Sequence, residues 1–252
     1  MTSVKLSSLI PPKFHSVWRA SLNQNILHVV CEGGRGSGKS SDVAHIIIQL
    51  IMRYAVNAVC IRKTDNTLEQ SVYEQLKWAI SGQQVTHLFK FNKSPLRITY
   101  LPRGNYIVFR GAQYPERIKS LKDSQFPFAI GWIEELAEFK TEDEVKTITN
   151  SLLRGESWVV VFFISFFIHT TRRNENSHGL TRIRYTVSTS KYVRSPFRLI
   201  LDNPYIAKEF IEEAEATKAR DERRYRWEYL GEAIGSGVVP FDNLRFETYQ
   251  MI

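Results

Sequence analysis

Residues 33–40 form a glycine-rich segment with the residue types and spacing of a phosphate-binding loop. The pattern G-x-x-x-x-G-K-S/T is matched at every fixed position within Gly33, Gly34, Arg35, Gly36, Ser37, Gly38, Lys39 and Ser40. Glycine lets backbone N–H groups curl around phosphate oxygens at φ angles that side chains disfavour. In such a loop Lys39 reaches the β- and γ-phosphates, and the Ser40 hydroxyl ligates Mg²⁺. The segment therefore predicts a binding site for a nucleotide and Mg²⁺.

Arg35 adds a cation inside this loop. Its guanidinium could stabilise negative charge on the γ-phosphate, which would make it a catalytic residue, or it could face solvent. The sequence leaves both interpretations open.

Two adjacent acids, Glu134 and Glu135, follow an apolar run further along the chain. An acid at the end of a buried strand can hold Mg²⁺ through water, and a second acid beside it can polarise the attacking water. Adjacent carboxylates repel each other, and a cation relieves that repulsion. The pair fits the Walker B arrangement of an ATPase that carries its own catalytic glutamate, and an ordinary acidic loop end is the alternative.

These two motifs lie between segments whose hydrophobic patterns alternate between strand and helix. Short apolar runs predict strands at residues 26–32, 57–62, 126–133 and 159–167, and a hairpin at residues 97–110. Apolar residues at helical spacing predict helices at residues 14–21, 40–54, 67–80, 142–153 and 205–230. This alternation indicates an α/β fold with a mostly parallel central sheet flanked by helices.

Composition and charge favour a globular protein with a polyanionic partner. The chain has 252 residues, 43% of them hydrophobic, which is enough for a sizeable core. Its formal net charge of +8 favours nucleic acid as the partner, over a basic surface without a specific partner. Cys31 and Cys60 lie in apolar runs outside any metal-binding pattern, so we expect buried free thiols. The longest apolar stretch, residues 158–168, is too short to cross a bilayer, and we expect a cytoplasmic protein without a membrane partner.

Several separated motifs resemble the large terminase subunit of tailed bacteriophages, in the branch from phages and prophages of Gram-positive bacteria. The resemblance rests on GGRGSGKS, IRKT at residues 61–64, FRGAQ at 109–113, ERIKSLKD at 116–123, WIEELAEF at 132–139 and the segment 202–244. It implies a P-loop NTPase of the ASCE type that hydrolyses ATP with Mg²⁺ and pushes double-stranded DNA through a portal into a procapsid. It also implies that Glu134 lies on the metal side and that Glu135 is the catalytic base.

The same resemblance implies partners and a domain organisation. The motor would act on DNA without sequence preference, together with a portal protein and a small terminase subunit, as a homo-oligomeric ring on the portal. The isolated chain would be a monomer, in the cytoplasm of the infected bacterial host. Residues 1–205 would form the P-loop ATPase domain, and residues 206–252 a C-terminal helix and the start of a linker toward a nuclease domain. Candidates for sensing nucleotide or contacting a neighbouring subunit are Arg62, Lys63, Arg110 and Lys119.

Residues 169–185, HTTRRNENSHGLTRIRY, depart from the family pattern. The family has a coupling motif here, Tyr-Asn-Pro-Pro followed by basic residues and Trp-Val-Asn-Lys. Codons for this segment, read from the third base of each, permit those residues in order. We therefore hypothesise that about residues 160–200 are translated out of frame, with a divergent insertion as the alternative. The coding DNA distinguishes the two.

Two other functions fit part of the pattern. One is a different P-loop DNA translocase or helicase. The other is a nucleotide-binding terminase remnant without efficient turnover, because the coupling motif senses the γ-phosphate and is not recognisable here. DNA-stimulated ATP hydrolysis separates a motor from a remnant.

Overall fold

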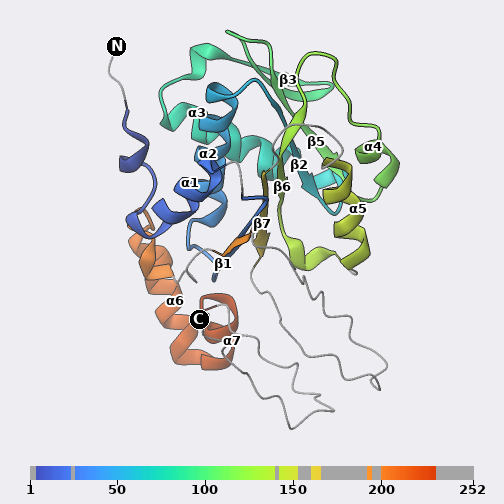
Figure 1. Cartoon of the computed structure of the whole chain (residues 1–252). Coiled ribbons are helices and arrows are strands. Elements are labelled where there is room, and N and C mark those ends of the chain that lie inside the picture. The colour runs from blue at the N-terminus through green and yellow to red at the C-terminus, as the bar shows by residue number, and fades with distance from the viewer. Residues whose placement is uncertain are drawn as a thin grey trace, which may run out of the picture.

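The computed structural model describes residues 4–23, 26–139, 142–152, 160–165, 192–194 and 200–230. Within these ranges a central sheet carries helices on both faces, and a pair of C-terminal helices lies at one end of it (Figure 1). The hypothesis of an out-of-frame segment falls mostly outside the described residues. Its first part, residues 160–165, forms a strand of the central sheet, as predicted from the apolar run.

Among the described residues the sheet has eight strands, in the order β3-β4-β5-β2-β6-β7-β1-β8. Their bounds are β1 His28–Glu32, β2 Asn57–Arg62, β3 Phe89–Lys93, β4 Leu96–Tyr100, β5 Tyr106–Gly111, β6 Phe128–Ile133, β7 Val160–Ser165 and β8 Tyr192–Arg194. Strands β5 to β8 in this order pair in parallel, while β3, β4 and β5 form an antiparallel edge. Strand β7 lies between β1, which leads into the glycine-rich loop, and β6, which leads into the acidic pair. That insertion is the ASCE arrangement, so the predicted fold class is confirmed.

The helices divide between the two faces of the sheet and its lower end (Figure 1). One face carries α1 His15–Leu22, α2 Lys39–Arg53 and α3 Glu74–Gly82, with a π-helical turn at Glu69–Tyr73 before α3. The other face carries α4 Pro115–Lys119 and α5 Glu142–Leu152. The C-terminal pair is α6 Lys208–Arg220 and α7 Glu222–Glu228. Short 3₁₀ turns occur at Leu6–Ser8, Pro12–Phe14, Asp65–Thr67, Thr86–Leu88, Leu136–Glu138 and Ile200–Asp202.

Helix α2 explains why the loop before it is held firmly. Its apolar residues at helical spacing, Val43, Ala44, Ile46, Ile47, Leu50 and Ile51, are all buried, as predicted. They pack against one side of β2, whose Ala58 and Cys60 belong to the same core. Val59 and Ile61 belong to the core on the other face of the sheet. A central parallel strand that is buried on both faces has a continuous apolar run, here Ala58 to Ile61, which is why its sequence alone predicts it.

Two parts of the observed structure differ from the sequence predictions. The single helix predicted at residues 205–230 is two helices, because the chain turns at Asp221, which has φ −154°. The Asp221 carboxylate accepts a hydrogen bond from the backbone N–H of Arg224 at 2.9 Å, an N-cap that starts α7. The predicted hairpin also gains a third strand, β3, which pairs with β4.

Candidate nucleotide-binding site

The glycine-rich loop leaves β1 and ends where α2 begins. Gly36 and Gly38 have φ angles of 74° and 79°, in the left-handed region that glycine adopts without strain. Helix α2 starts at Lys39, so the unpaired N–H groups of its first turn face the loop. A helix N-terminus behind a loop of this kind attracts an anion. The backbone therefore has the form that the sequence pattern predicts.

Lys39 lies inside the loop. Its Nζ donates hydrogen bonds to the carbonyl oxygens of Gly33 and Gly34, at 2.8 and 2.9 Å, and to Ser37 Oγ at 3.0 Å. Ser37 Oγ donates in turn to the Gly34 carbonyl at 2.8 Å. The ammonium is thus buried among groups that hold it at the centre of the loop, and its contact with phosphate stays a prediction.

Glu134, which follows β6, meets Ser40 in the first turn of α2. Ser40 Oγ donates to one Glu134 carboxylate oxygen at 2.7 Å, and Trp132 Nε1 donates to the other at 2.7 Å. Burial raises the pKa of Glu134 to about 7 against hydrogen bonds from Ser40 and Trp132, and the nearby Glu135 carboxylate also raises it. A carboxylate with a raised pKa beside a hydroxyl is a pair of hard oxygen donors that a divalent cation would stabilise.

These two oxygen donors fit Mg²⁺. Within the described ranges, no group of three or more His, Cys, Asp or Glu side chains could hold a metal ion. Mg²⁺ is commonly held by one or two protein oxygens and by the phosphates of its nucleotide, so the pair of Ser40 and Glu134 suffices for it.

Glu135 has an unusual backbone. Its φ and ψ angles of 53° and 58° place it in the left-handed region, which costs a non-glycine residue about 1–3 kcal/mol. Burial raises the pKa of its carboxyl group, and the nearby guanidinium of Arg62 opposes that shift. Arg62 forms an ion pair with Glu138 at 2.7 Å, and its charge also acts on Glu135. Strain at an acid beside the phosphate loop is typical of a functional position.

A cleft of about 390 Å³ brings the predicted residues together. Its lining contains the predicted residues Arg35, Gly36, Ser37, Gly38, Lys39, Ser40, Glu134 and Glu135. Gly33 and Gly34 lie outside this lining and meet Lys39 through their carbonyl oxygens. Arg35 is exposed at the cleft, and its charge lowers the pKa of Glu135. The loop and the acidic pair, distant in sequence, therefore form one site.

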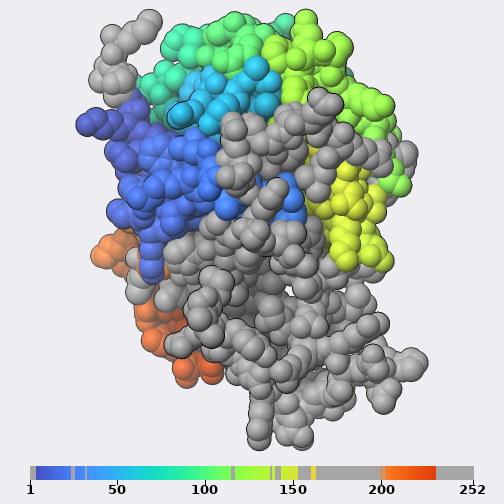
Figure 2. Space-filling model, viewed as in Figure 1, coloured from blue at the N-terminus to red at the C-terminus, as the bar shows by residue number. Residues whose placement is uncertain are grey.

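Sequence reasoning missed the residues that line this cleft from α6 and the segment before it. They are Asn203, Tyr205, Ile206, Ala207 and Phe210. Asn203 Nδ2 donates to the Gly36 carbonyl at 2.8 Å, and the Arg35 N–H donates to the Glu228 carbonyl at 2.8 Å. Figure 2 shows α6 and α7 (orange) below the N-terminal segment (blue). These are tertiary contacts, and no local pattern in residues 203–230 indicates them.

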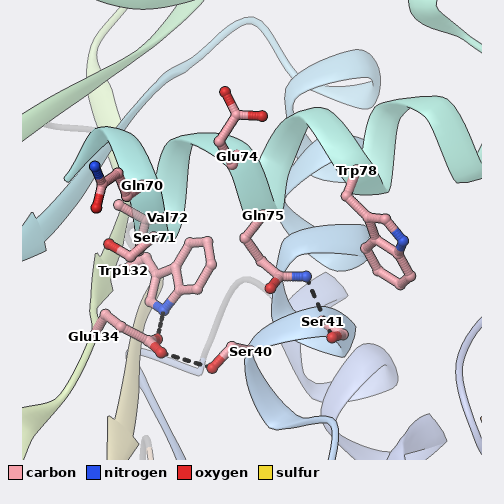
Figure 3. Close-up of a pocket in the computed structure, with 10 residues that line it drawn as sticks. All are labelled: Ser40, Ser41, Gln70, Ser71, Val72, Glu74, Gln75, Trp78, Trp132 and Glu134. Carbon is pink, nitrogen blue, oxygen red and sulfur yellow. Dashed lines mark hydrogen bonds between the residues drawn. The ribbon is translucent and has the colours of Figure 1, made fainter. Parts of the chain in front are cut away.

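A second cavity, of about 500 Å³, lies on the other side of the pair formed by Ser40 and Glu134 (Figure 3). Trp132 and Glu134 form its floor, and residues of the π-helical turn and α3 form its wall. Gln75 Nε2 donates to Ser41 Oγ at 3.3 Å across it, and the exposed Trp78 lies at its edge. This cavity shares its floor with the candidate site and belongs to it.

The four basic residues that the resemblance named lie outside the nucleotide cleft. Arg62 pairs with Glu138, and Lys63 pairs with Glu144 at 2.6 Å. Arg110 lies near other arginines at the antiparallel edge of the sheet, and Lys119 is exposed at the end of α4.

Comparison with known proteins identifies the family. A family model described as phage terminase large subunit matches residues 25–232. This chain belongs to the phage terminase large subunit family. The large terminase subunit of Bacillus phage SPP1 is 47% identical over 250 residues, 98% of this chain and 58% of that protein. The PBSX phage terminase large subunit of Bacillus subtilis (strain 168) is 29% identical over 110 residues, 44% of this chain and 24% of that protein.

Solved terminase structures share the fold. A large terminase from a thermophilic bacteriophage, in complex with ATP-gamma-S, aligns with 87% of this chain and 51% of its own at a TM-score of 0.62 and 14% identity. The ATPase domain of the Thermus phage P74-26 large terminase aligns with 82% of this chain and 88% of its own at a TM-score of 0.53 and 16% identity. The family match and these likenesses confirm the family and the P-loop fold that the sequence motifs predict.

The chain spans little more than half the length of its SPP1 relative. Among the helices described, none combines the length and apolar character that crossing a membrane requires.

Proposed function

We propose that this chain is the ATP-hydrolysing motor domain of a phage large terminase and that it powers packaging of double-stranded DNA into procapsids. The observation that carries the proposal is the meeting of Ser40, Glu134 and Glu135 at one cleft beside Lys39. This constellation contains each part that phosphoryl transfer to water needs: a phosphate cradle, a metal-side acid and a base.

The residues divide the chemistry between them. Ser40 and Glu134 would hold Mg²⁺, which supplies neutralising charge at the phosphates when it is bound with ATP. Lys39 would exchange the carbonyl oxygens of Gly33 and Gly34 for phosphate oxygens. Glu135 would accept a proton from the water that attacks the γ-phosphorus, while the bond to the β-phosphate oxygen breaks. Its raised pKa makes it a better proton acceptor than an ordinary glutamate.

Arg35 has the position of a charge stabiliser in this scheme. It is exposed at the cleft, and its charge acts on Glu135. A guanidinium here would stabilise the charge on the γ-phosphate as the bond breaks. Its backbone N–H donates a hydrogen bond to the carbonyl oxygen of Glu228 at the end of α7, so α7 fixes the position of the Arg35 backbone.

The remaining partners follow from the family. The chain would work as a homo-oligomeric ring with a portal protein and a small terminase subunit, in the cytoplasm of the infected host, and as a monomer when isolated. Its contact with DNA would depend on phosphates and carry no base preference. The ATPase domain would comprise residues 1–205. Residues 206–252 would form a C-terminal helix and the start of a linker toward a nuclease domain.

Steady-state release of phosphate from ATP tests the proposal. We expect turnover that requires Mg²⁺, that rises when linear double-stranded DNA is added, and that is lost in Lys39→Ala. Nucleotide binding without turnover would instead favour a terminase remnant, an alternative that the unrecognisable coupling motif at residues 169–185 keeps open. A chain that binds no nucleotide would contradict both.

A further inference from the structure

A cluster of arginines lies on the antiparallel edge of the sheet, away from the nucleotide cleft. Arg97 on β4 is directly opposite Val108 on β5. Side chains two residues apart on a strand share a face, so Arg97 has Tyr106 and Arg110 as diagonal neighbours. Figure 1 shows β3 at the top, β5 below it and α4 to the right of β5. The strand register thus places two arginines side by side.

The contacts of Arg97 leave part of its guanidinium group unused. Its Cζ lies 3.9 Å from the centroid of the Tyr106 ring, so the guanidinium stacks on that ring. Its Nε is shielded from solvent and has no hydrogen-bond partner in the described part of the chain. A buried donor without a partner is costly, so the guanidinium of Arg97 is held here by its stacking on Tyr106 and not by a hydrogen bond through Nε.

Arg110 shows that positive charge accumulates at this place. Burial lowers the pKa of Arg110 against the nearby carboxylate of Asp65, and the neighbouring Arg117 and Arg97 lower it further. Its Nη1 donates a hydrogen bond to the carbonyl of the preceding residue, Phe109, at 2.8 Å. Mutual repulsion among guanidinium groups is relieved by an anion.

The two nearby carboxylates are already engaged in hydrogen bonds, and Asp65 also pairs with Arg117 of the cluster itself. Asp123 accepts hydrogen bonds from the backbone N–H groups of Gln125 and Phe126, both at 2.8 Å, and from the Tyr106 hydroxyl at 2.7 Å. Asp65 accepts one from the Gly111 N–H and lies 3.5 Å from Arg117. They therefore organise the loops around the arginines, and the cluster keeps a net positive charge.

Further basic and polar side chains extend this face. Lys90 on β3 pairs in register with Thr99 and is exposed, and Asn92 pairs in register with Arg97. Lys119 and Lys122 are exposed in and after α4. Several cations spread along one face suit a ligand that carries phosphates at intervals, as a nucleic acid backbone does.

We propose that this face, named here the edge arginine face and defined by Arg97, Arg110 and Arg117, binds the phosphate backbone of double-stranded DNA. The proposal rests on the packaging function proposed above and assigns a place to the DNA contact. Guanidinium groups bind phosphate with paired hydrogen bonds, and stacking on Tyr106 holds Arg97 ready for that geometry.

The strand ends connect this face with the acidic pair. Arg62 at the end of β2 lies in register with Gly111 at the end of β5, and its carbonyl accepts the N–H of Ala112 at 2.8 Å. On its other side, β2 receives the N–H of Glu134 at the Ile61 carbonyl, at 2.9 Å. The paired strands β5, β2 and β6 therefore form a continuous hydrogen-bonded connection between this face and Glu134.

Binding of a fluorescent random-sequence DNA duplex, measured by anisotropy at several salt concentrations, tests the proposal with the full 252-residue chain. The double variant Arg97→Gln/Arg110→Gln should bind at least about tenfold more weakly. The slope of its log affinity against log salt should be smaller by about 2, since two phosphate contacts are lost. Arg220→Gln, which removes a single charge from the exposed part of α6, should bind as the wild type does.

Two controls separate DNA binding from folding and from other anions. Arg97→Lys/Arg110→Lys keeps the charges and should restore most of the salt slope, whereas damaged packing would not be restored. ATP hydrolysis without DNA should be unchanged in the glutamine variant, since neither arginine lines the nucleotide cleft.

Five results would overturn the proposal. The glutamine variant could bind DNA with the affinity and slope of the wild type, or the wild type could fail to bind the duplex. Inorganic phosphate at constant ionic strength could displace the duplex at millimolar levels, which would indicate a site for single phosphate ions. Polyglutamate could bind as tightly as DNA and lose affinity in the same variant, which would indicate an acidic protein partner. DNA-stimulated hydrolysis that persists in the variant would leave the proposed function intact while removing this DNA site.

Discussion

Replacing Glu134 with glutamine changes the charge of the candidate site while keeping its shape. The protonated form of Glu134 can offer one acceptor to Trp132 Nε1 and one donor to Ser40 Oγ, across contacts of 2.7 Å each. A glutamine amide offers the same acceptor and donor. The variant should therefore fold as the wild type does, and it should not titrate.

The expected effect on stability follows from the pKa of Glu134. Burial raises it from 4.5 to about 7, a change that corresponds to roughly 3 kcal/mol at alkaline pH. Solvent that reaches this partly buried carboxylate reduces the difference to about 2 kcal/mol. Because the folded-state pKa is raised, the stability contributed by the neutral acid is complete below about 4.5 and is lost as the pH rises through about 7.

Thermal unfolding without Mg²⁺ and nucleotide, at several pH values between about 5 and 8, tests this reasoning. The glutamine variant should be nearly as stable as the wild type at the acid end and about 4–8 °C more stable at the alkaline end. His28 and His45 titrate in the opposite sense, because burial lowers their pKa values to about 4 and their contribution is lost as the pH falls. They are present in both proteins, so the comparison cancels them. A stability difference that does not change with pH would refute the reasoning.

Three further predictions follow from the same site. Gly34→Ala would place a Cβ 1.8 Å from the Tyr229 carbonyl oxygen, so it should lower stability by about 1–3 kcal/mol in urea unfolding and weaken ATP binding. Glu135→Gly should be more stable than Glu135→Ala by about 1 kcal/mol in the same assay, since only glycine is unstrained at this left-handed position; equal stabilities would contradict the strain. Binding of Mg²⁺ with ATP near neutral pH should release a fraction of a proton from Glu134, seen as a buffer-dependent heat in calorimetry, and Glu134→Gln should reduce that dependence.

The sequence predicts most of the fold because its central elements carry strong local signals. Strand β2 has the predicted bounds, since both of its faces are buried and its four central residues, Ala58 to Ile61, are apolar. Helix α2 differs from its predicted range by one residue at each end, because its apolar spacing and the glycine before it mark its start. The meeting of Ser40 and Glu134 could also be foreseen, since parallel strands end at the same edge of a sheet.

The features that sequence reasoning missed depend on contacts between distant segments. Gly36 is covered by Ile206 and Phe210, which come from the far end of the described chain. Arg97 and Arg110 lie on the same face of the sheet because of the register between β4 and β5, which the sequence does not specify. The break at Asp221 was a different kind of miss. An aspartate is a common N-cap, so the signal was present inside a charged run that also fits a single helix.

The central claim is that Glu135 acts as the base for ATP hydrolysis at this loop. The most direct test measures single-turnover hydrolysis and ATP affinity for the wild type and for Glu135→Gln, both with saturating Mg²⁺ and DNA. We expect the variant to bind ATP nearly as tightly as the wild type and to hydrolyse it at least about a hundredfold more slowly. A variant that hydrolyses ATP within a few-fold of the wild-type rate would contradict the assignment of Glu135 as the base.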